Sequence, residues 1–173
     1  MTSTIQLFSL TPMLADFMNE CDKLGYTNNN SLTAMKFDWC RENDGSWWAT
    51  VKDNKIVSVS GVHQFLDGYR ALYRGAQIET RPFTGLNKYQ MQNYAFVDHL
   101  PKQIEWADGK PVYITTSPHN DKDRSGKMSR VHRSAEVLAK QGVFVYIKDD
   151  TLFNVPQAVW QVNVEKYNEI RKS

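Results

Sequence analysis

The sequence predicts an α/β fold with a mixed, mostly antiparallel central sheet of six to seven strands and helices on both faces. The length of 173 residues suits one core of good size, so we expect a single domain over 1–173. Hydrophobic residues make up 41% of the chain and charged residues 23%, which is ordinary for a globular protein. β-branched and aromatic runs alternate along the chain with runs of helical period, and this alternation predicts the α/β class.

The first forty residues predict a strand and then helix. A weakly alternating segment over 4–9 precedes a helix in which Leu14 and Phe17 recur at helical spacing, with Thr11 as its cap and Pro12 at its first position. Gly25 follows as a helix stop. A short second helix fits 32–42.

The strongest signal is a three-strand antiparallel meander over 46–81. Its strands are SWWATVKD, KIVSVSGVHQF and RALYRGAQIETRP, and their β-branched and aromatic residues favour strands. Asp53-Asn54 and Asp67-Gly68 fall where hairpin turns need residues that accept positive φ. Pro82 ends the third strand, because proline donates no hydrogen bond to a ladder.

Helices and strands alternate over the rest of the chain. We expect a helix over 86–100 that Pro101 closes, a strand over 111–117, and a helix over 128–140 that buries Val131 and Leu138 and ends at Gly142. Two strands, VFVYIKD and AVWQVNV, then finish the chain.

Composition excludes several classes of protein. Twenty-one basic and nineteen acidic residues give a charge of +2, so bulk charge does not indicate nucleic-acid binding. We expect neither a signal peptide nor a membrane span, because the N-terminus lacks a basic region and no apolar run is long enough. Cys21 and Cys40, like the four histidines, lack metal-ligand spacing, which predicts buried reduced thiols, no bound metal and a cytoplasmic protein.

The order of elements, with a meander, a loop leading into a helix, and a later helix ending in AKQGVFVYI, resembles the GNAT acetyltransferase superfamily. The resemblance covers nearly the whole chain. It implies an acyl-CoA-dependent N-acyltransferase that takes acetyl-CoA, or another acyl-CoA, as cosubstrate. It also implies direct attack by a small-molecule or peptide amine, without a covalent enzyme intermediate.

In this superfamily a glycine-rich turn after the third meander strand holds the CoA pyrophosphate on backbone amides at a helix N-terminus. The family pattern falls on Pro82, Gly85 and Asn87 of RPFTGLNKY, and only Gly85 fits it. Arg81 and Lys88 would supply positive charge beside the turn. The resemblance thus implies cofactor contacts at Ile78, Thr80, Arg81, Thr84, Gly85, Leu86, Asn87 and Lys88.

Direct attack needs a base for the ammonium and an acid for the departing thiolate. Glu79, near the end of the third strand, is our first candidate base, with a solvated carboxylate as the alternative reading; His63, on the neighbouring strand, is the second. Leu138 occupies the position of the tyrosine that often serves as acid in the family. Tyr146 and Tyr113 are then the nearest tyrosines by segment, and Tyr146 is our candidate acid.

Two other readings stay open. A noncatalytic GNAT-like binding or interaction module is the alternative, and the departures from the family at Pro82, Asn87 and Leu138 favour it. The cations in 119–133 could contact CoA phosphates or RNA, or could form a solvated surface. The sequence does not decide between a monomer and a homodimer.

Overall fold

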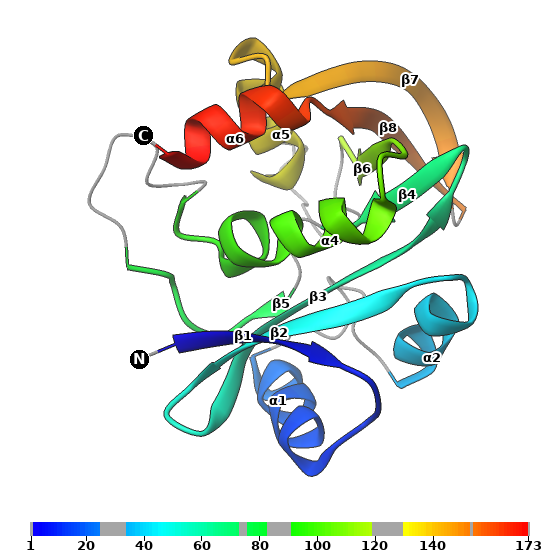
Figure 1. Cartoon of the computed structure of the whole chain (residues 1–173). Coiled ribbons are helices and arrows are strands. Elements are labelled where there is room, and N and C mark those ends of the chain that lie inside the picture. Colours follow the sequence, from blue (N-terminus) through cyan, green and yellow to red (C-terminus); the bar gives the residue numbers. More distant parts are fainter. Residues whose placement is uncertain are drawn as a thin grey trace. The chain divides into compact units, whose positions relative to one another are not determined.

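The computed structural model describes residues 2–24, 34–72, 76–82, 91–118, 130–152 and 154–172. The chain forms two compact units, Met1–Lys110 and Pro111–Ser173. Each unit contains strands and helices, drawn in Figure 1. Whether they make one domain, as we expect, stays a prediction.

The first unit is built on an antiparallel sheet. Its strands are β1 (Thr2–Leu7), β2 (Ser46–Lys52), β3 (Lys55–Phe65), β4 (Gly68–Ala71) and β5 (Ala76–Gln77). β1 pairs with β2 and β2 with β3, while β4 and β5 both pair with β3. The predicted turn at Asp53 and Asn54 is confirmed, since both residues have positive φ, 51° and 64°.

One extra residue in β3 shifts the β2–β3 register. Val51 pairs with Ile56, but Thr50 pairs with Ser58, so Val57 is a bulge residue. Because side chains alternate along a strand, the bulge brings Thr50, Ser58 and Ser60 to the same face of the sheet. A regular hairpin would have placed Thr50 opposite Val57.

The third meander strand differs from the prediction, because it is two short strands and not one. Val62 pairs with Ala71, whereas Val59 pairs with Ala76. Between these two pairs β3 advances by three residues, whereas the outgoing strand advances by five. Leu72 still donates its N–H to the Gly61 carbonyl, and residues 73–75, between the two short strands, lie outside the described residues.

The face of this sheet that carries α1 (Pro12–Lys23) and α2 (Ala34–Glu42) is apolar. Both helices lie below the strands in Figure 1. Thr11 caps α1 as predicted, since its Oγ1 accepts a hydrogen bond from the Leu14 N–H at 3.2 Å. The buried cluster on this face contains Leu7, Leu14, Phe17, Cys21, Phe37, Cys40, Trp47, Ala49, Ile56, Val59 and Ala76. Both cysteines are buried free thiols, and burial raises each pKa to about 11.

The opposite face carries a π-helix, η2 (Ala95–His99), that continues directly into α4 (Leu100–Ala107). Our expectation that Pro101 closes this helix is wrong. Pro101 lies in the first turn of α4, where a missing N–H is tolerated, and the helix runs on to Ala107. The wider π turn comes immediately before the proline.

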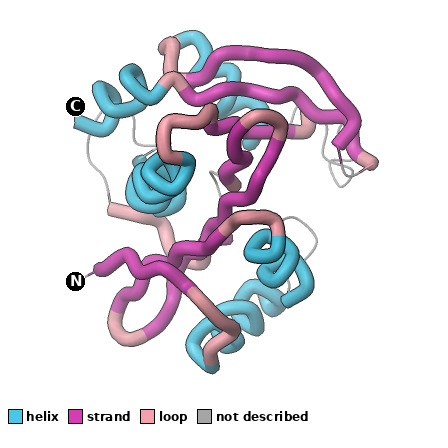
Figure 2. Tube along the Cα trace, turned by 45° about the vertical axis from the view of Figure 1, so that its right-hand side comes forward, coloured by secondary structure: helices cyan, strands magenta, loops and turns pink. Residues whose placement is uncertain are grey.

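The second unit contains β6 (Val112–Thr116), α5 (Arg130–Lys140), β7 (Phe144–Leu152), β8 (Val155–Val162) and α6 (Val164–Lys172). β8 pairs with both β6 and β7, and Figure 2 shows the β7–β8 hairpin as two long strands side by side. Gly142 follows α5 at φ 78°, which confirms it as the helix stop.

Two predictions for this unit are wrong. The chain does not finish on a strand, because α6 follows β8 and buries Tyr167 completely. Val131 is 36% exposed, and His132 takes the inward position with Ala135 and Leu138 at a spacing of three residues. In the described residues no helix is long and apolar enough to cross a membrane.

Candidate functional site

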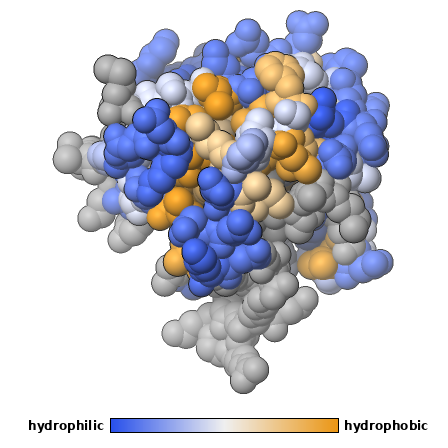
Figure 3. Space-filling view, turned by 90° about the horizontal axis from the view of Figure 1, so that it is seen from below, coloured by the Kyte–Doolittle hydropathy of each residue, from blue (hydrophilic) through white to orange (hydrophobic). Residues whose placement is uncertain are grey.

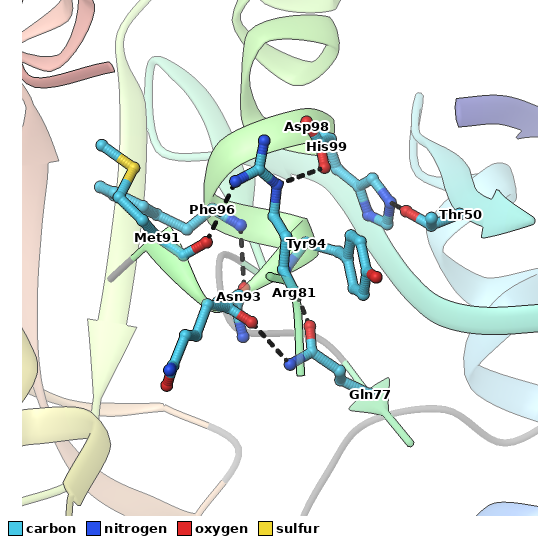
Figure 4. Close-up of polar contacts among 10 residues, drawn as sticks. Thr50, Gln77, Arg81, Met91, Asn93, Tyr94, Phe96, Asp98 and His99 are labelled. Atoms are coloured by element: carbon cyan, nitrogen blue, oxygen red, sulfur yellow. Dashed lines mark hydrogen bonds and ion pairs between the residues drawn. The ribbon is translucent and has the colours of Figure 1, made fainter. Parts of the chain in front are cut away.

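The end of the third meander strand is tied to the helical segment that follows it (Figure 4). The backbone N–H of Arg81 donates to the carbonyl of Gln92 at 2.8 Å, and the amide of Gln77 donates to the same carbonyl at 3.0 Å. These bonds hold together the two ends of the connection over 83–90. Thr84, Gly85, Leu86, Asn87 and Lys88 belong to that connection and lie outside the described residues.

The side chain of Arg81 faces the helical segment. Its Nε donates to Asp98 Oδ2 at 3.1 Å, and its Nη1 donates to the carbonyl of Met91 at 3.3 Å (Figure 4). Both partners of the ion pair are under one-third exposed, so this contact orders the guanidinium more than a surface pair would. Arg81, the cation that we predicted to contact the cofactor, is thus half-buried, and the carboxylate of Asp98 orients its guanidinium.

The start of the π-helix is capped by side chains. Gln77 Oε1 accepts a hydrogen bond from the Tyr94 N–H at 2.8 Å, and Asn93 Oδ1 accepts one from the Phe96 N–H at 2.9 Å (Figure 4). Because these N–H groups are satisfied internally, they are not the donors for a phosphate.

Glu79 lies at the closed end of the β2–β3 hairpin. Its Oε2 accepts from Lys52 Nζ at 3.2 Å, and its Oε1 is 4.0 Å from Lys55 Nζ. The carboxylate is half-buried between two ammonium groups. Of the predicted cofactor contacts beside it, Ile78 packs on the apolar cluster and donates its N–H to Val57, while Thr80 is exposed.

His63 lies at the other end of β3. Nδ1 donates to the Gln64 carbonyl at 2.8 Å, so Nε2 carries the lone pair, and Arg70 Nη1 is 3.2 Å from it. Burial, and then the charge of Arg70, lower the pKa of His63 to about 4. Continuing the β3–β5 register from Ser58↔Gln77 puts Glu79 opposite Ile56, roughly 20 Å along the strand from His63. The two candidate bases do not form one site.

The candidate acid belongs to the second unit. Tyr146 is 51% exposed, its ring contacts the edge of Trp160 at 5.6 Å between centroids, and a hydrogen bond with Asp149 raises its pKa. Tyr113 and Leu138 are both buried. Tyr146 is thus the accessible tyrosine of the two that we predicted.

His132 links α5 to the sheet of the second unit. Its Nδ1 is 2.8 Å from Thr116 Oγ1, which also accepts from the Trp160 indole N–H at 2.9 Å. Its Nε2 is 3.1 Å from Glu136 Oε1. This is a hydrogen-bonded core histidine.

A buried polar layer on the η2 face was not predicted. His99 has both ring nitrogens in hydrogen bonds, Nε2 with Thr50 Oγ1 at 2.8 Å and Nδ1 with Ser60 Oγ at 2.9 Å. Gln103 Nε2 donates to Ser60 Oγ at 2.9 Å. The S-x-S pattern at Ser58 and Ser60 was the available signal, since hydroxyls at both positions of a buried face are unusual.

A groove lies on the other face of the first unit, between α1 and the β2–β3 hairpin. Its apolar lining is Met13, Phe17, Ile56 and Ile78. Figure 3, which views this side from below, shows hydrophobic side chains between hydrophilic ones. The rim carries two acidic and two basic residues, Asp16, Glu20, Lys23 and Lys55, so it has no charge preference.

No protein-family model matches the sequence, and no curated protein matches it. Solved structures do. An aminoglycoside 6'-N-acetyltransferase from Enterococcus faecium has a TM-score of 0.57 at 13% identity, over 92% of this chain and 95% of that chain. An aminoglycoside 6'-N-acetyltransferase complexed with coenzyme A has a TM-score of 0.56 at 13% identity, over 92% and 95%. The ribosomal-protein-S18-alanine N-acetyltransferase from Escherichia coli has a TM-score of 0.56 at 10% identity, over 94% and 93%.

The chain therefore has an α/β acetyltransferase fold. Specifically, it has the GNAT fold, as the order of its elements predicted, and the expected fold class is confirmed. At such low sequence identity, these similarities show the fold alone. The substrate and the activity have to be argued from the residues. Among the described residues no group of three or more His, Cys, Asp or Glu side chains is placed to hold a metal ion.

Proposed function

We propose that this chain is an acyl-CoA-dependent N-acyltransferase that moves an acetyl group from acetyl-CoA to an amine. The observation that carries the proposal is the interrupted third strand followed by a helical segment fastened to the strand end. Attack on a thioester needs a backbone amide that polarises its carbonyl, and we propose that this part of the third strand supplies it. The connection over 83–90, held at both ends by the Gln92 carbonyl, is where phosphates would bind.

The similar structures support this cosubstrate. One of them is complexed with coenzyme A, and the others acetylate an aminoglycoside or a ribosomal protein, which carry amines. We propose a small-molecule or peptide amine as acceptor here too. Two buried free cysteines suit a reducing compartment, so we place the enzyme in the cytoplasm.

In the proposed reaction the amine nitrogen attacks the thioester carbonyl carbon, the C–N bond forms and the C–S bond breaks. A base removes the proton from the ammonium, and the thiolate takes up a proton as it leaves. Glu79 is the better candidate base, because its carboxylate is partly open to solvent and lies beside the Lys52 ammonium. His63 is the poorer one, because burial lowers its pKa to about 4 and Arg70 faces its lone pair. Tyr146 is the proposed acid.

The alternative is a noncatalytic module with a GNAT fold. The inward pairing of Arg81 with Asp98 favours it, because a guanidinium held by a carboxylate has less charge to offer a pyrophosphate. Pro82 and Asn87, where the family pattern fails, favour it too.

Calorimetric titration with acetyl-CoA separates the two functions. We expect binding in the micromolar range, weakened about tenfold by Arg81→Ala and abolished by Gly85→Trp, because the first removes a positive charge and the second fills the turn. Lys23→Ala, on the surface of α1, is the matched control for loss of a cation and should change nothing. Absence of binding at millimolar acetyl-CoA would leave only the noncatalytic module.

A further inference from the structure

We propose that a partly buried group of basic side chains on α2 and the β3–β4 hairpin binds an oxyanion, the carboxylate or phosphate group of a small molecule. The group consists of Lys36 on α2, His63 on β3 and Arg70 on β4, all in the first unit. None of the three is among the predicted cofactor contacts. The inference therefore does not depend on the proposed acyl transfer.

The β3–β4 pairing places His63 and Arg70 side by side. They are cross-strand partners, and the ring of His63 contacts Trp39 of α2, so both side chains lie on the face of the sheet that carries α2. His63 Nδ1 donates to the Gln64 carbonyl, which leaves Nε2 to accept from Arg70 Nη1 at 3.2 Å. His63 is buried and orients the guanidinium, whereas Arg70 keeps part of its surface exposed.

Helical spacing places Lys36 beside this pair. The rings of Trp39 and His63 meet edge to face at 4.7 Å between centroids, so this side of α2 lies against the hairpin. Lys36 precedes Trp39 by three residues and shares its side of the helix. Asp38 and Glu42 fall on the opposite side, and both are exposed. The helix therefore directs its lysine toward the hairpin and its two carboxylates away from it.

The next carboxylate along the chain, Asp44, is held on the other face of β4. The hydroxyl of Tyr69 donates to Asp44 Oδ2, and the Trp106 indole N–H donates to the Asp44 carbonyl at 3.1 Å. Tyr69 is adjacent to Arg70 in the strand, so the two side chains point to opposite faces. Asp67, in the exposed turn of the hairpin, is the remaining acidic residue of these elements.

The basic groups act on one another. Burial, and then the charge of Arg70, lower the pKa of Lys36, and burial lowers the pKa of Arg70 to about 10. Burial, Arg70 and, more weakly, Lys36 lower the pKa of His63 to about 4. Three basic groups with lowered pKa in one place are typical of a functional site, because their charged forms are disfavoured until an anion arrives.

The residue types suit an oxyanion. A guanidinium binds a carboxylate or a phosphate through two parallel N–H bonds, and an ammonium adds a point charge. Trp39 and Phe65 both contact the ring of His63 and are half-buried, so they limit the water around it. Charges that are partly withdrawn from water are screened less by salt, which strengthens their attraction for an anion.

The test is an NMR titration with benzoate and, separately, with inorganic phosphate, following the indole N–H signal of Trp39, which Trp39→Phe identifies. We expect a saturating shift with a Kd on the order of 1 mM for at least one anion, and the tighter of the two shows whether the group is a carboxylate or a phosphate. Arg70→Gln and Lys36→Gln should each weaken binding at least about tenfold.

Arg41→Gln is the matched control. Arg41 is an exposed cation on the same helix, over the Phe37 ring at 5.8 Å from its centroid, so its loss should change the affinity less than about twofold. The Trp106 indole signal, from the other face of the sheet, should not move in any titration. The Trp47 indole signal, whose N–H donates to the Phe37 carbonyl, shows that each variant is folded. Lys36→Gln carries the test if Arg70→Gln does not fold.

A Trp39 signal that does not move at about 50 mM of either anion would overturn the proposal. Equal weakening in Arg41→Gln would overturn it too, since the attraction would then belong to the surface of α2 as a whole. Binding that appears only in Asp67→Asn would mean that this carboxylate already neutralises the group. No titration uses acetyl-CoA, so failure here leaves the proposed acyl transfer standing.

Discussion

At the scale of single residues, His99 and His63 are buried imidazoles in the first unit. Burial lowers the pKa of His99 to about 3, and burial and Arg70 lower that of His63 to about 4. Both values lie below 6.5, the ordinary pKa of an imidazole. The folded state therefore favours the neutral ring, while the unfolded chain takes up a proton as soon as the pH falls below that value.

We accordingly expect the contribution of these two histidines to the free energy of unfolding to be complete above pH 6.5. The free energy of unfolding should then decrease as the pH falls toward the pKa values of the folded state. His99 alone accounts for about 3 kcal/mol of loss between pH 7 and pH 4, as an order of magnitude. Urea denaturation followed by Trp fluorescence at these two pH values measures it. His99→Gln, which cannot titrate, should lose less stability over that range, and an equal loss in the variant and the wild type would contradict the assignment.

The sequence indicated some of these residues and could not indicate others. Thr11, Pro12 and Asn54 act locally, through a cap, a fixed φ and a turn, so their roles follow from their neighbours in the chain. His99 depends on Thr50 and Ser60, which are 49 and 39 residues away. The bulge at Val57 decides that pairing, and no residue type marks a bulge in advance.

At the scale of elements, the meander was predictable and its interruption was not. Within 70–81 Gly75 lowers the strand propensity, but a single glycine does not by itself distinguish a divided strand from a continuous one. Pro101 illustrates the opposite error, because a boundary was predicted there and the helix continues through it. A proline ends most helices, but it is also favoured in a first turn, and the π turn at Ala95–His99 makes Leu100 the start of a new helix.

The C-terminal helix α6 was not predicted, because the apolar face that it buries is narrow. Only Tyr167 is buried among its residues, so the hydrophobic period is almost absent from the sequence. The ring of Tyr167 is fully buried, and Arg171 lies over it at 5.7 Å from the ring centroid. One aromatic side chain thus anchors the whole helix.

We expect Tyr167→Ala to destabilise the protein by about 3–4 kcal/mol, because it removes a buried aromatic ring and leaves a cavity. The decrease in the denaturation midpoint, with the slope unchanged, is the measurement. Glu169→Ala is the control on the same helix. It removes only an exposed pair with Lys166, so we expect a change below about 0.5 kcal/mol. A small effect of Tyr167→Ala would mean that α6 contributes little to the fold.

At the scale of the whole molecule, the order of elements was enough to predict the fold. A GNAT fold could therefore be predicted although only one residue of the phosphate turn, Gly85, fits the family pattern. The site followed less well. Glu79, His63 and Tyr146 are each in place on a strand or its end, yet Glu79 and His63 lie at opposite ends of β3, a separation that linear spacing does not reveal. Chemistry depends on distances, and the chain order alone does not give them.

The most direct test of the central claim is the release of free CoA thiol from acetyl-CoA in the presence of an amine panel that includes an aminoglycoside and a peptide N-terminus. We predict amine-dependent release, reduced about a hundredfold or more in Glu79→Gln, which keeps the shape of the side chain and removes its basicity. His63→Gln should retain most of the activity. Release that no amine stimulates, in a protein that still binds acetyl-CoA, would contradict the claim and identify the chain as a noncatalytic module.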